Sequence, residues 1–248
     1  MIKAVLFDLG GTLLHYPGTT SKQLFADGMA RLHAELVKRG YAAPEREALR
    51  RRMARAIRVR AALRFFSMRE LKFEKILVHV LGRHKVRLKS GETEHLARAF
   101  WRAYSEHIVY YDDMVVTIEK LRKMGLKVGL ISNTIWPAWI LREELGRASK
   151  AALFDVMLFS PEVGYRKPSR RIFRKALKQL GLKGREAAFV GDSPVEDVRG
   201  PQSVRMMTIL KLPVRSKLRR STQPDFKVQH LAEVPAIIEK VNAWGSTG

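Results

Sequence analysis

The sequence has no cysteine and no long apolar run, and it has few acidic residues for a chain of 248. Without cysteine, neither a disulfide framework nor a thiolate metal site can form, which fits a cytoplasmic protein. No stretch approaches the roughly 20 apolar residues that a membrane helix needs. Because the chain reaches a carboxylate at Asp8 after a very short apolar run, we expect neither a signal peptide nor a membrane partner.

Basic residues are abundant instead. Lys and Arg number 47 against 24 Asp and Glu, which gives a net charge of +23. Such a surface attracts phosphorylated metabolites, nucleic acid or anionic lipid. The alternative, which we favour, is that many of the arginines are simply solvated on helix faces. The hydrophobic fraction of 46% is that of a globular chain, so a buried core is expected.

Short apolar runs alternate with helical patterns over most of the chain. The first run, Ala4–Phe7, ends at Asp8 and a glycine turn, as a buried strand would. Further strands are expected at 127–131, 156–159, 187–190 and 206–210, with helices between them and a basic loop at 211–222. This alternation predicts parallel βαβ units, and therefore an α/β fold with a Rossmann-like parallel sheet as its core.

The segment between the first two strands has a helical pattern instead. Apolar residues recur at helical spacing from Phe25 to Leu36 and again from Leu49 to Ile57. We therefore predict an inserted all-helical domain at 16–111, and a core formed by 1–15 and 112–248.

Residues with reactive side chains follow several of the expected strands. In an open parallel sheet, ligands bind at the carboxyl ends of the strands. Asp8, Ser132, Lys167 and Asp192 fall at those ends or in the loop after one of them. The two carboxylates can hold Mg²⁺, a cation that takes oxygen ligands, while Lys167 and Ser132 can hold phosphate oxygens. Phosphoryl transfer through an aspartyl-phosphate is therefore chemically sensible.

Four ordered segments carry a family resemblance. They are Phe7–Leu13 (FDLGGTL), Ile131–Thr134 (ISNT), Arg166–Pro168 (RKP) with Phe173 after it, and Gly191–Gly200 (GDSPVEDVRG). They resemble the four motifs of the haloacid dehalogenase-like (HAD-like) hydrolase superfamily, and residues 224–225 and 231–233 look like the tail of its phosphatase branch. The resemblance spans nearly the whole chain except the insertion, which it identifies as a helical cap over the site.

The resemblance implies a nucleophile and a metal site. It makes Asp8 the nucleophile and a Mg²⁺ ligand, with Asp192 as the second carboxylate ligand and the backbone carbonyl of Gly10 as a further one. Asp197 would support these groups from behind. The protein would be a Mg²⁺-dependent phosphatase acting on a small phosphorylated substrate.

The resemblance also implies the residues that bind the substrate. Ser132 and Lys167 would hold the phosphate and share in catalysis with Asp8. Thr12 and Asn133 would belong to the same substrate-binding site.

The sequence departs from the family pattern at Gly10. Phosphatases of the family carry an Asp there, which protonates the leaving group and then deprotonates the attacking water. Glycine has no side chain to do this, and a positioned acid/base is worth about 10²–10⁴-fold in rate. The metal role survives, because it uses the backbone carbonyl.

Two of the interpretations that stay open are enzymatic. The favoured one is a phosphatase whose substrate has a good leaving group or which uses a stand-in acid, such as His15 or Tyr16. The other is a phosphonatase-like or dehalogenase-like hydrolase. A phosphonatase-like enzyme would need a lysine of the insertion for a Schiff base, with Lys22, Lys72 and Lys75 as candidates.

The remaining two interpretations are binding roles. One is a non-catalytic or weakly catalytic binding protein for a phosphorylated ligand. The other is a nucleic-acid-associated protein with residues 46–69 as the contact face. Only Phe65 and Phe66 supply aromatics there, and they fit a core better than a stacking surface, so nucleic acid is not favoured.

Overall fold

The computed structural model of the protein describes residues 1–63, 68–212 and 223–244. Phe65, Phe66 and most of the expected 211–222 loop therefore lie outside the described residues. The chain divides into two compact units. We call residues 1–15, 110–133 and 145–248 the α/β unit, and residues 16–109 and 134–144 the helical unit.

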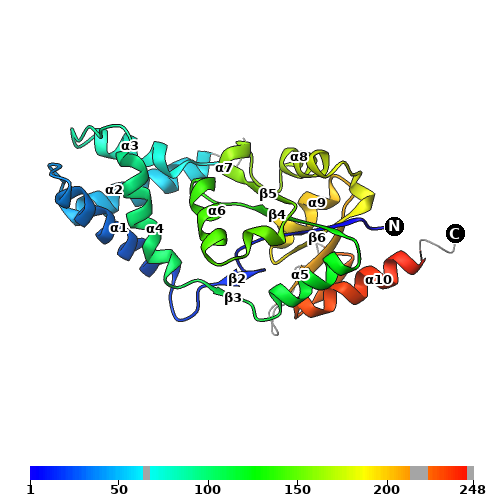
Figure 1. Ribbon diagram of the computed structural model, residues 1–248. Coiled ribbons are helices and arrows are strands. Elements are labelled where there is room, and N and C mark those ends of the chain that lie inside the picture. The colour runs from blue at the N-terminus through cyan, green and yellow to red at the C-terminus, as the bar shows by residue number, and fades with distance from the viewer. Residues whose placement is uncertain (64–67, 213–222, 245–248) are drawn as a thin grey trace. The chain divides into compact units, whose positions relative to one another are not determined.

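The α/β unit is built on a sheet of six parallel strands in the order β5-β4-β1-β6-β7-β8 (Figure 1). The strands are β1 (Ala4–Phe7), β4 (Lys127–Ser132), β5 (Val156–Phe159), β6 (Ala187–Gly191), β7 (Met207–Lys211) and β8 (Phe226–Val228). The fully buried β1 pairs with β4 on one side and β6 on the other. The expected α/β fold with a Rossmann-like parallel sheet is confirmed, and β8 adds a strand that was not expected.

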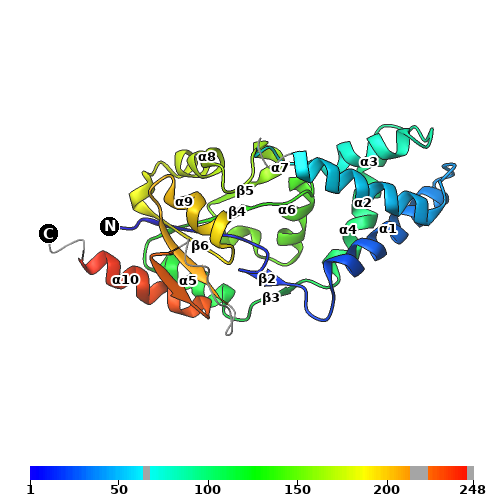
Figure 2. The same ribbon diagram turned by 180° about the vertical axis from the view of Figure 1, so that it is seen from behind.

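Helices cover both faces of this sheet, with α8 and α9 on one face and α5 and α10 on the other (Figures 1 and 2). They are α5 (Met114–Lys123), α7 (Ser160–Val163), α8 (Arg170–Leu180), α9 (Gly200–Gln202) and α10 (Val234–Trp244). Short 3₁₀ turns η1 (Ala151–Leu153), η2 (Gly184–Glu186) and η4 (Leu231–Glu233), and the π-helical turn η3 (Pro194–Arg199), connect them. Two short strands, β2 (Leu14–His15) and β3 (Val109–Tyr110), form a separate sheet.

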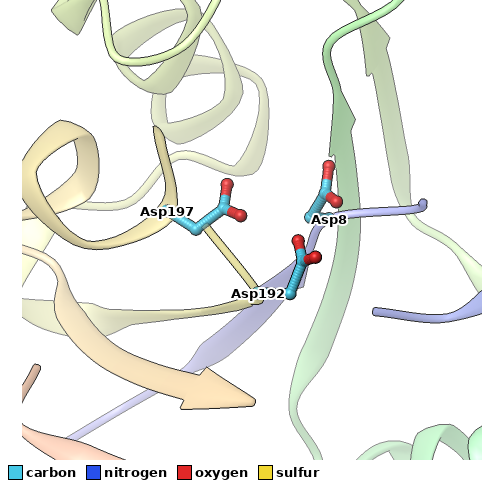
Figure 3. Close-up of side chains that lie close together, drawn as sticks. All are labelled: Asp8, Asp192 and Asp197. Carbon is cyan, nitrogen blue, oxygen red and sulfur yellow. The ribbon is translucent and has the colours of Figure 1, made fainter. Parts of the chain in front are cut away.

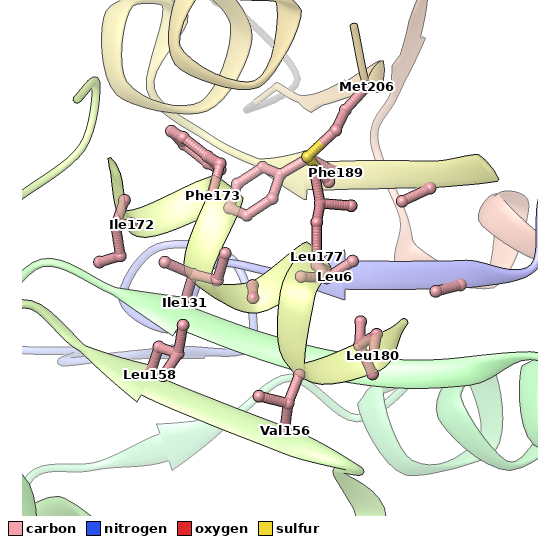
Figure 4. Packing of buried hydrophobic residues seen from close by; sticks show 13 residues of the cluster. Leu6, Ile131, Val156, Leu158, Ile172, Phe173, Leu177, Leu180, Phe189 and Met206 are labelled. Atoms are coloured by element: carbon pink, nitrogen blue, oxygen red, sulfur yellow. The ribbon is translucent and has the colours of Figure 1, made fainter. Parts of the chain in front are cut away.

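Helix α8 provides the largest apolar contact with the sheet. It begins after Ser169, whose hydroxyl accepts a hydrogen bond from the Arg171 N–H at 3.4 Å, and ends at Gly181 in the left-handed region (φ 69°). Its buried face packs on strands β1, β4, β5 and β6, with Phe173 edge-on to Phe189 at 5.4 Å between ring centroids (Figure 4). Because Lys167 lies just before α8, this packing anchors the segment that carries it.

The helical unit contains α1 (Ser21–Lys38), α2 (Arg46–Leu63), α3 (Phe73–Gly82) and α4 (Glu92–Ser105). Helix α1 starts with a capping box between Thr20 and Gln23. It approaches α4 closely at Gly28, because a Cβ there would overlap the ring of Phe100.

Residues 134–144, which include most of α6 (Ala138–Arg147), pack with this unit rather than with the core to which the sequence assigned them. The physical reason is Trp136, whose ring lies 4.7 Å from that of Phe73 and 5.1 Å from that of Phe100 between centroids. Among the helices of the described residues, none combines the length and apolar character needed to cross a bilayer.

Candidate active site

Asp8 stands where β1 leaves the sheet. Its N–H donates to the Val190 carbonyl at 2.9 Å, and its side chain is buried, with 7% of the residue exposed. The turn that follows depends on Gly11, which has a φ of +82°, and a Cβ on Gly11 would collide with the Asp192 carboxylate. Gly10 differs, because a Cβ there would meet no atom of the described residues within 4 Å. A side chain at position 10 is therefore sterically allowed.

Lys167 joins two of the carboxylates. Its Nζ donates to Asp8 Oδ1 and to Asp197 Oδ1, each at 2.6 Å, and only 1% of the residue is exposed. Asn133, just past the end of β4, fixes the backbone of Lys167. The Lys167 N–H donates to Asn133 Oδ1 at 2.8 Å, and Asn133 Nδ2 donates to the Lys167 carbonyl at 3.0 Å. Asn133 thus positions the lysine.

Asp192 and Asp197 come from the end of β6 and the turn after it. Asp197 Oδ2 accepts from the Ser193 N–H at 2.9 Å, and its Oδ1 accepts from Lys167. Glycine is required at position 191, because a Cβ there would overlap the Asp197 side chain. The carboxylates of Asp8, Asp192 and Asp197 converge, with ligand oxygens all within 4.8 Å of one another (Figure 3).

Burial dominates the electrostatics of this cluster. It raises the pKa of Asp8 to about 7, with Lys167 opposing this shift and the Asp197 carboxylate adding to it. Burial alone would lower the pKa of Lys167, but Asp197 and Asp8 outweigh it and raise that pKa. The pKa of Asp192 is also raised, by partial burial and by Asp197.

The donor set fits a hard divalent cation. Carboxylate oxygens are the ligands that Mg²⁺ prefers, and a cation would offset the repulsion among three clustered carboxylates. All three carboxylates offer oxygens to such a cation, and both oxygens of Asp197 already accept a hydrogen bond, from Lys167 and from the Ser193 N–H.

The other sequence-predicted residues lie at the same edge of the sheet. Ser132 is the last residue of β4 and is 5% exposed. Thr12 is fully buried, and its hydroxyl has no hydrogen-bond partner among the described residues. Of the two candidate stand-in acids, His15 lies in the α/β unit with Asp8, whereas Tyr16 belongs to the helical unit. His15 Nδ1 is buried and has no partner in the part of the chain that the structure describes.

The sequence did not identify Lys211 as a residue of this region. Lys211 was expected to begin a basic loop, but it is the last residue of β7 and is 6% exposed. Its Nζ donates to the Thr12 carbonyl at 3.2 Å and lies over the Tyr111 ring, 2.9 Å from the centroid. The strand-end rule that selected Asp8 could have found it, because Lys211 directly follows the run 206–210.

Comparison with known proteins identifies the family of this chain. A profile described as haloacid dehalogenase-like hydrolase matches residues 2–204, so the chain belongs to this family. The chain is 29% identical over 212 residues to a ribulose-1,5-bisphosphate 5-phosphatase of Halopiger xanaduensis, which covers 85% of this chain and 84% of that one. It is 36% identical over 142 residues to a phosphoserine phosphatase of Thermus thermophilus, over 56% and 55% of the two chains.

These similarities have a limited extent. The chain spans about half the length of several curated relatives that it matches. Among solved structures, a 2-haloacid dehalogenase of Pseudomonas syringae pv. tomato shares the fold, with a TM-score of 0.70 and 23% identity over 97% of this chain and 100% of that one.

Proposed function

We propose that the protein is a Mg²⁺-dependent phosphatase that acts on a small phosphorylated substrate through an aspartyl-phosphate at Asp8. The observation that carries this proposal is the bridge formed by Lys167, whose Nζ lies 2.6 Å from both Asp8 and Asp197. It holds a carboxylate at the end of β1, beside a second carboxylate, Asp192, that could share a cation with it. The phosphatase relatives support the same reading.

The metal site would use Asp8, Asp192 and the carbonyl of Gly10. When bound there, Mg²⁺ would supply positive charge to the phosphoryl oxygens. Lys167, together with the hydroxyl of Ser132, would hold the remaining phosphoryl oxygens. Asp197 would keep Lys167 in place through their hydrogen bond, which makes Asp197 a positioning residue.

The reaction would run in two displacements at phosphorus. An oxygen of Asp8 attacks the phosphorus, the ester P–O bond breaks, and the leaving oxygen departs with the bonding pair and takes up a proton. Water then attacks the phosphorus of the aspartyl-phosphate, loses a proton, and releases inorganic phosphate with the Asp8 carboxylate restored. Both proton transfers normally involve the side chain that Gly10 lacks.

Two explanations for turnover without that side chain are consistent with the structure. A substrate whose leaving group needs no proton, such as an acyl or aryl phosphate, would bypass the first transfer. Alternatively, His15 would serve as the stand-in acid, because its Nδ1 is buried and forms no hydrogen bond with the described residues. The phosphonatase-like reading is weaker. Lys22, Lys72 and Lys75 are all exposed, whereas a Schiff-base lysine is activated by a desolvated pocket.

The test compares four proteins with Mg²⁺ on an aryl phosphate, an acyl phosphate and an alkyl phosphate, the last of which has a poor leaving group. The native chain, Asp8→Asn, Gly10→Asp and His15→Gln are assayed for phosphate release. We expect Asp8→Asn to abolish release, and Gly10→Asp to raise it by about 10²–10⁴-fold on esters with poor leaving groups. The Gly10→Asp change is a clean test, since position 10 has room for a side chain. Unchanged release by Asp8→Asn would refute the proposal.

Chelation provides the metal control. Release that persists in excess EDTA and is not increased by added Mg²⁺ would contradict the metal part of the proposal alone. An inert native chain that gains activity on Gly10→Asp substitution would instead indicate a phosphate-binding protein on a competent scaffold.

A further inference from the structure

A cavity of about 680 Å³ lies within the α/β unit, next to the candidate active site. Lys211, Tyr111 and His230 line it together with Gly11 and three acidic residues, Asp112, Asp113 and Asp192. Asp8 does not line it. The cavity therefore shares Asp192 with the carboxylate cluster, and the proposed reaction gives its other lining side chains no role.

Lys211 provides a positively charged side chain in the wall of this cavity. The register pairs Leu210 of β7 with Gly191 of β6, so Lys211 and Asp192 lie at the same level of the sheet edge. Strand β7 is two positions from β1 in the sheet, and neighbouring strands lie about 4.8 Å apart. The carboxyl ends of β1 and β7 are therefore about 10 Å apart. Two acidic groups of one small metabolite can span such a distance.

The ammonium group of Lys211 is only partly satisfied. One donor goes to the Thr12 carbonyl, and the Tyr111 ring covers another side. Among the described residues, no carboxylate forms an ion pair with it. Asp113, another residue of the cavity wall, instead accepts from the Ala232 N–H at 3.2 Å. Burial lowers the pKa of Lys211 to about 8, against the opposing effect of Asp113 and Asp192. The two carboxylates thus compensate the burial of this cation only in part, and an anionic ligand in direct contact with it would relieve the remaining cost.

We propose that Lys211 and the cavity beside it bind a second anionic group of the substrate, a carboxylate or a phosphate, while Asp8 acts on the phosphoryl group. This inference rests on the proposed phosphatase function and narrows its substrates to phosphorylated acids and bisphosphates. Tyr111 would position the lysine by covering it. The remaining ammonium donor would reach the ligand.

The experiment uses three probes with Mg²⁺: glycerol 3-phosphate, which has no second acid, 3-phosphoglycerate, which adds a carboxylate, and fructose 1,6-bisphosphate, which adds a phosphate. The proteins are the native chain, Lys211→Met, Lys211→Arg and the control Lys227→Met on the exposed face of neighbouring β8. Because a charge-assisted hydrogen bond contributes about 1.5–3 kcal/mol, we expect Lys211→Met to lower kcat/KM by about 10–100-fold on at least one diacid. The change on glycerol 3-phosphate should stay within about 3-fold, as it should for Lys227→Met on every probe.

The two diacids separate the sources of the anion. A selective loss on 3-phosphoglycerate indicates a carboxylate site, and one on fructose 1,6-bisphosphate a phosphate site. Lys211→Arg should recover part of either loss, because it keeps the charge. Equal losses on all three probes would overturn the proposal, because Lys211 would then act on the transferred phosphoryl group or on folding. Unchanged kinetics would overturn it as well.

A binding measurement keeps this test separate from that of the proposed function. In the Asp8→Asn background, where no turnover is expected, each diacid should raise the thermal unfolding midpoint more than glycerol 3-phosphate does. Adding Lys211→Met should remove that difference. If the native chain hydrolyses nothing, the phosphatase proposal fails while the thermal shifts still decide whether the cavity binds anions. Equal shifts with and without Lys211 would refute the anion site itself.

Discussion

The α/β unit and the helical unit differ in the burial of charged side chains, because the buried charged residues among the described ones all belong to the α/β unit. In the α/β unit, Asp8, Asp197 and Lys167 are buried together and bonded to one another. In the helical unit, arginines of α2 and Arg83 line a groove of about 530 Å³, and none of its lining residues in the described part of the chain is acidic. The same excess of basic residues therefore gives a few buried lysines with specific partners and a larger number of solvated arginines.

Burial determines how strongly an ion pair contributes to the stability of the fold. An exposed ion pair such as Arg31–Glu106, at 2.6 Å, is worth about 0–1 kcal/mol, because water and salt screen it. Removing one partner of a buried pair leaves an uncompensated charge and costs about 3–5 kcal/mol. Substituting a charged residue should therefore lower the unfolding free energy more at the buried cluster of the α/β unit than at an exposed ion pair of the helical unit. Unfolding experiments can measure this difference.

The largest effect is expected at Lys167. The Lys167→Met variant leaves the buried carboxylates of Asp8 and Asp197 facing each other without a cation, so we expect a loss of about 3–5 kcal/mol of unfolding free energy in EDTA. Urea unfolding followed by circular dichroism measures this loss. The double variant Lys167→Met/Asp197→Asn should recover part of it, because one of the stranded charges is gone. A loss below about 1 kcal/mol would show that the cluster is better hydrated than its burial suggests.

The sequence predicted the buried part of the molecule well. The strands around Asp8 and Asp192 are continuous apolar runs, and burial on both faces of the sheet forces that composition. Parallel topology then brings their carboxyl ends to one edge, which is why Asp8, Lys167 and Asp192 were expected together before their distances were known, whereas Asp197 was implied by the family resemblance alone.

The parts that were missed depend on contacts with no local signal. Strand β8 has three residues and an exposed Lys227, too short a run for periodicity to show. Trp136 follows the second motif in sequence but belongs to the helical unit, because its partners Phe73 and Phe100 are distant in the chain. The sequence did not show that Asn133 would bond to the backbone of Lys167, because the two residues are 34 positions apart.

The helical unit should be sensitive to packing even where it is insensitive to charge. Gly28→Ala places a methyl group against the ring of Phe100, and overpacking of this kind costs about 1–3 kcal/mol. Gly82→Ala is the matched control, because a Cβ in that helical position meets no atom of the described residues within 4 Å. It should be neutral or stabilising by up to about 1 kcal/mol. Equal effects of the two variants in urea unfolding would mean that α1 and α4 are not packed closely at Gly28.

Lys211 offers a comparison within the α/β unit, since it is buried without the counterions that Lys167 has. Its pKa falls from 10.5 to about 8 on folding. Between those values the unfolded chain binds the proton more tightly, so this group makes stability rise with pH, and below about pH 8 the folded chain bears the full cost. Lys211→Met should therefore be more stable than the native chain at pH 7, by on the order of 1 kcal/mol. Its advantage should shrink as pH rises from about 8 to 10.

The measurement is the difference in unfolding free energy between Lys211→Met and the native chain at each pH. The other titrating groups are the same in both proteins, so their effect cancels in this difference. Urea unfolding in EDTA at pH 7, 8, 9 and 10 provides it, with Lys227→Met as the exposed control. A constant difference across this range would mean that Lys211 keeps its proton throughout and that Asp113 and Asp192 compensate it more fully than burial penalises it.

The smallest effect is expected in the arginine groove of the helical unit. Arg52→Gln and Arg55→Gln each remove a charge that faces water and like charges, so each should change the unfolding free energy by no more than about 0.5 kcal/mol. The sign should favour the variants at low salt, where repulsion among the arginines is least screened, and the gain should vanish near 1 M salt, at a Debye length of about 3 Å. A loss above 1 kcal/mol would mean that these arginines are structural, and the contrast between the buried charges of the α/β unit and the exposed charges of the helical unit would no longer hold.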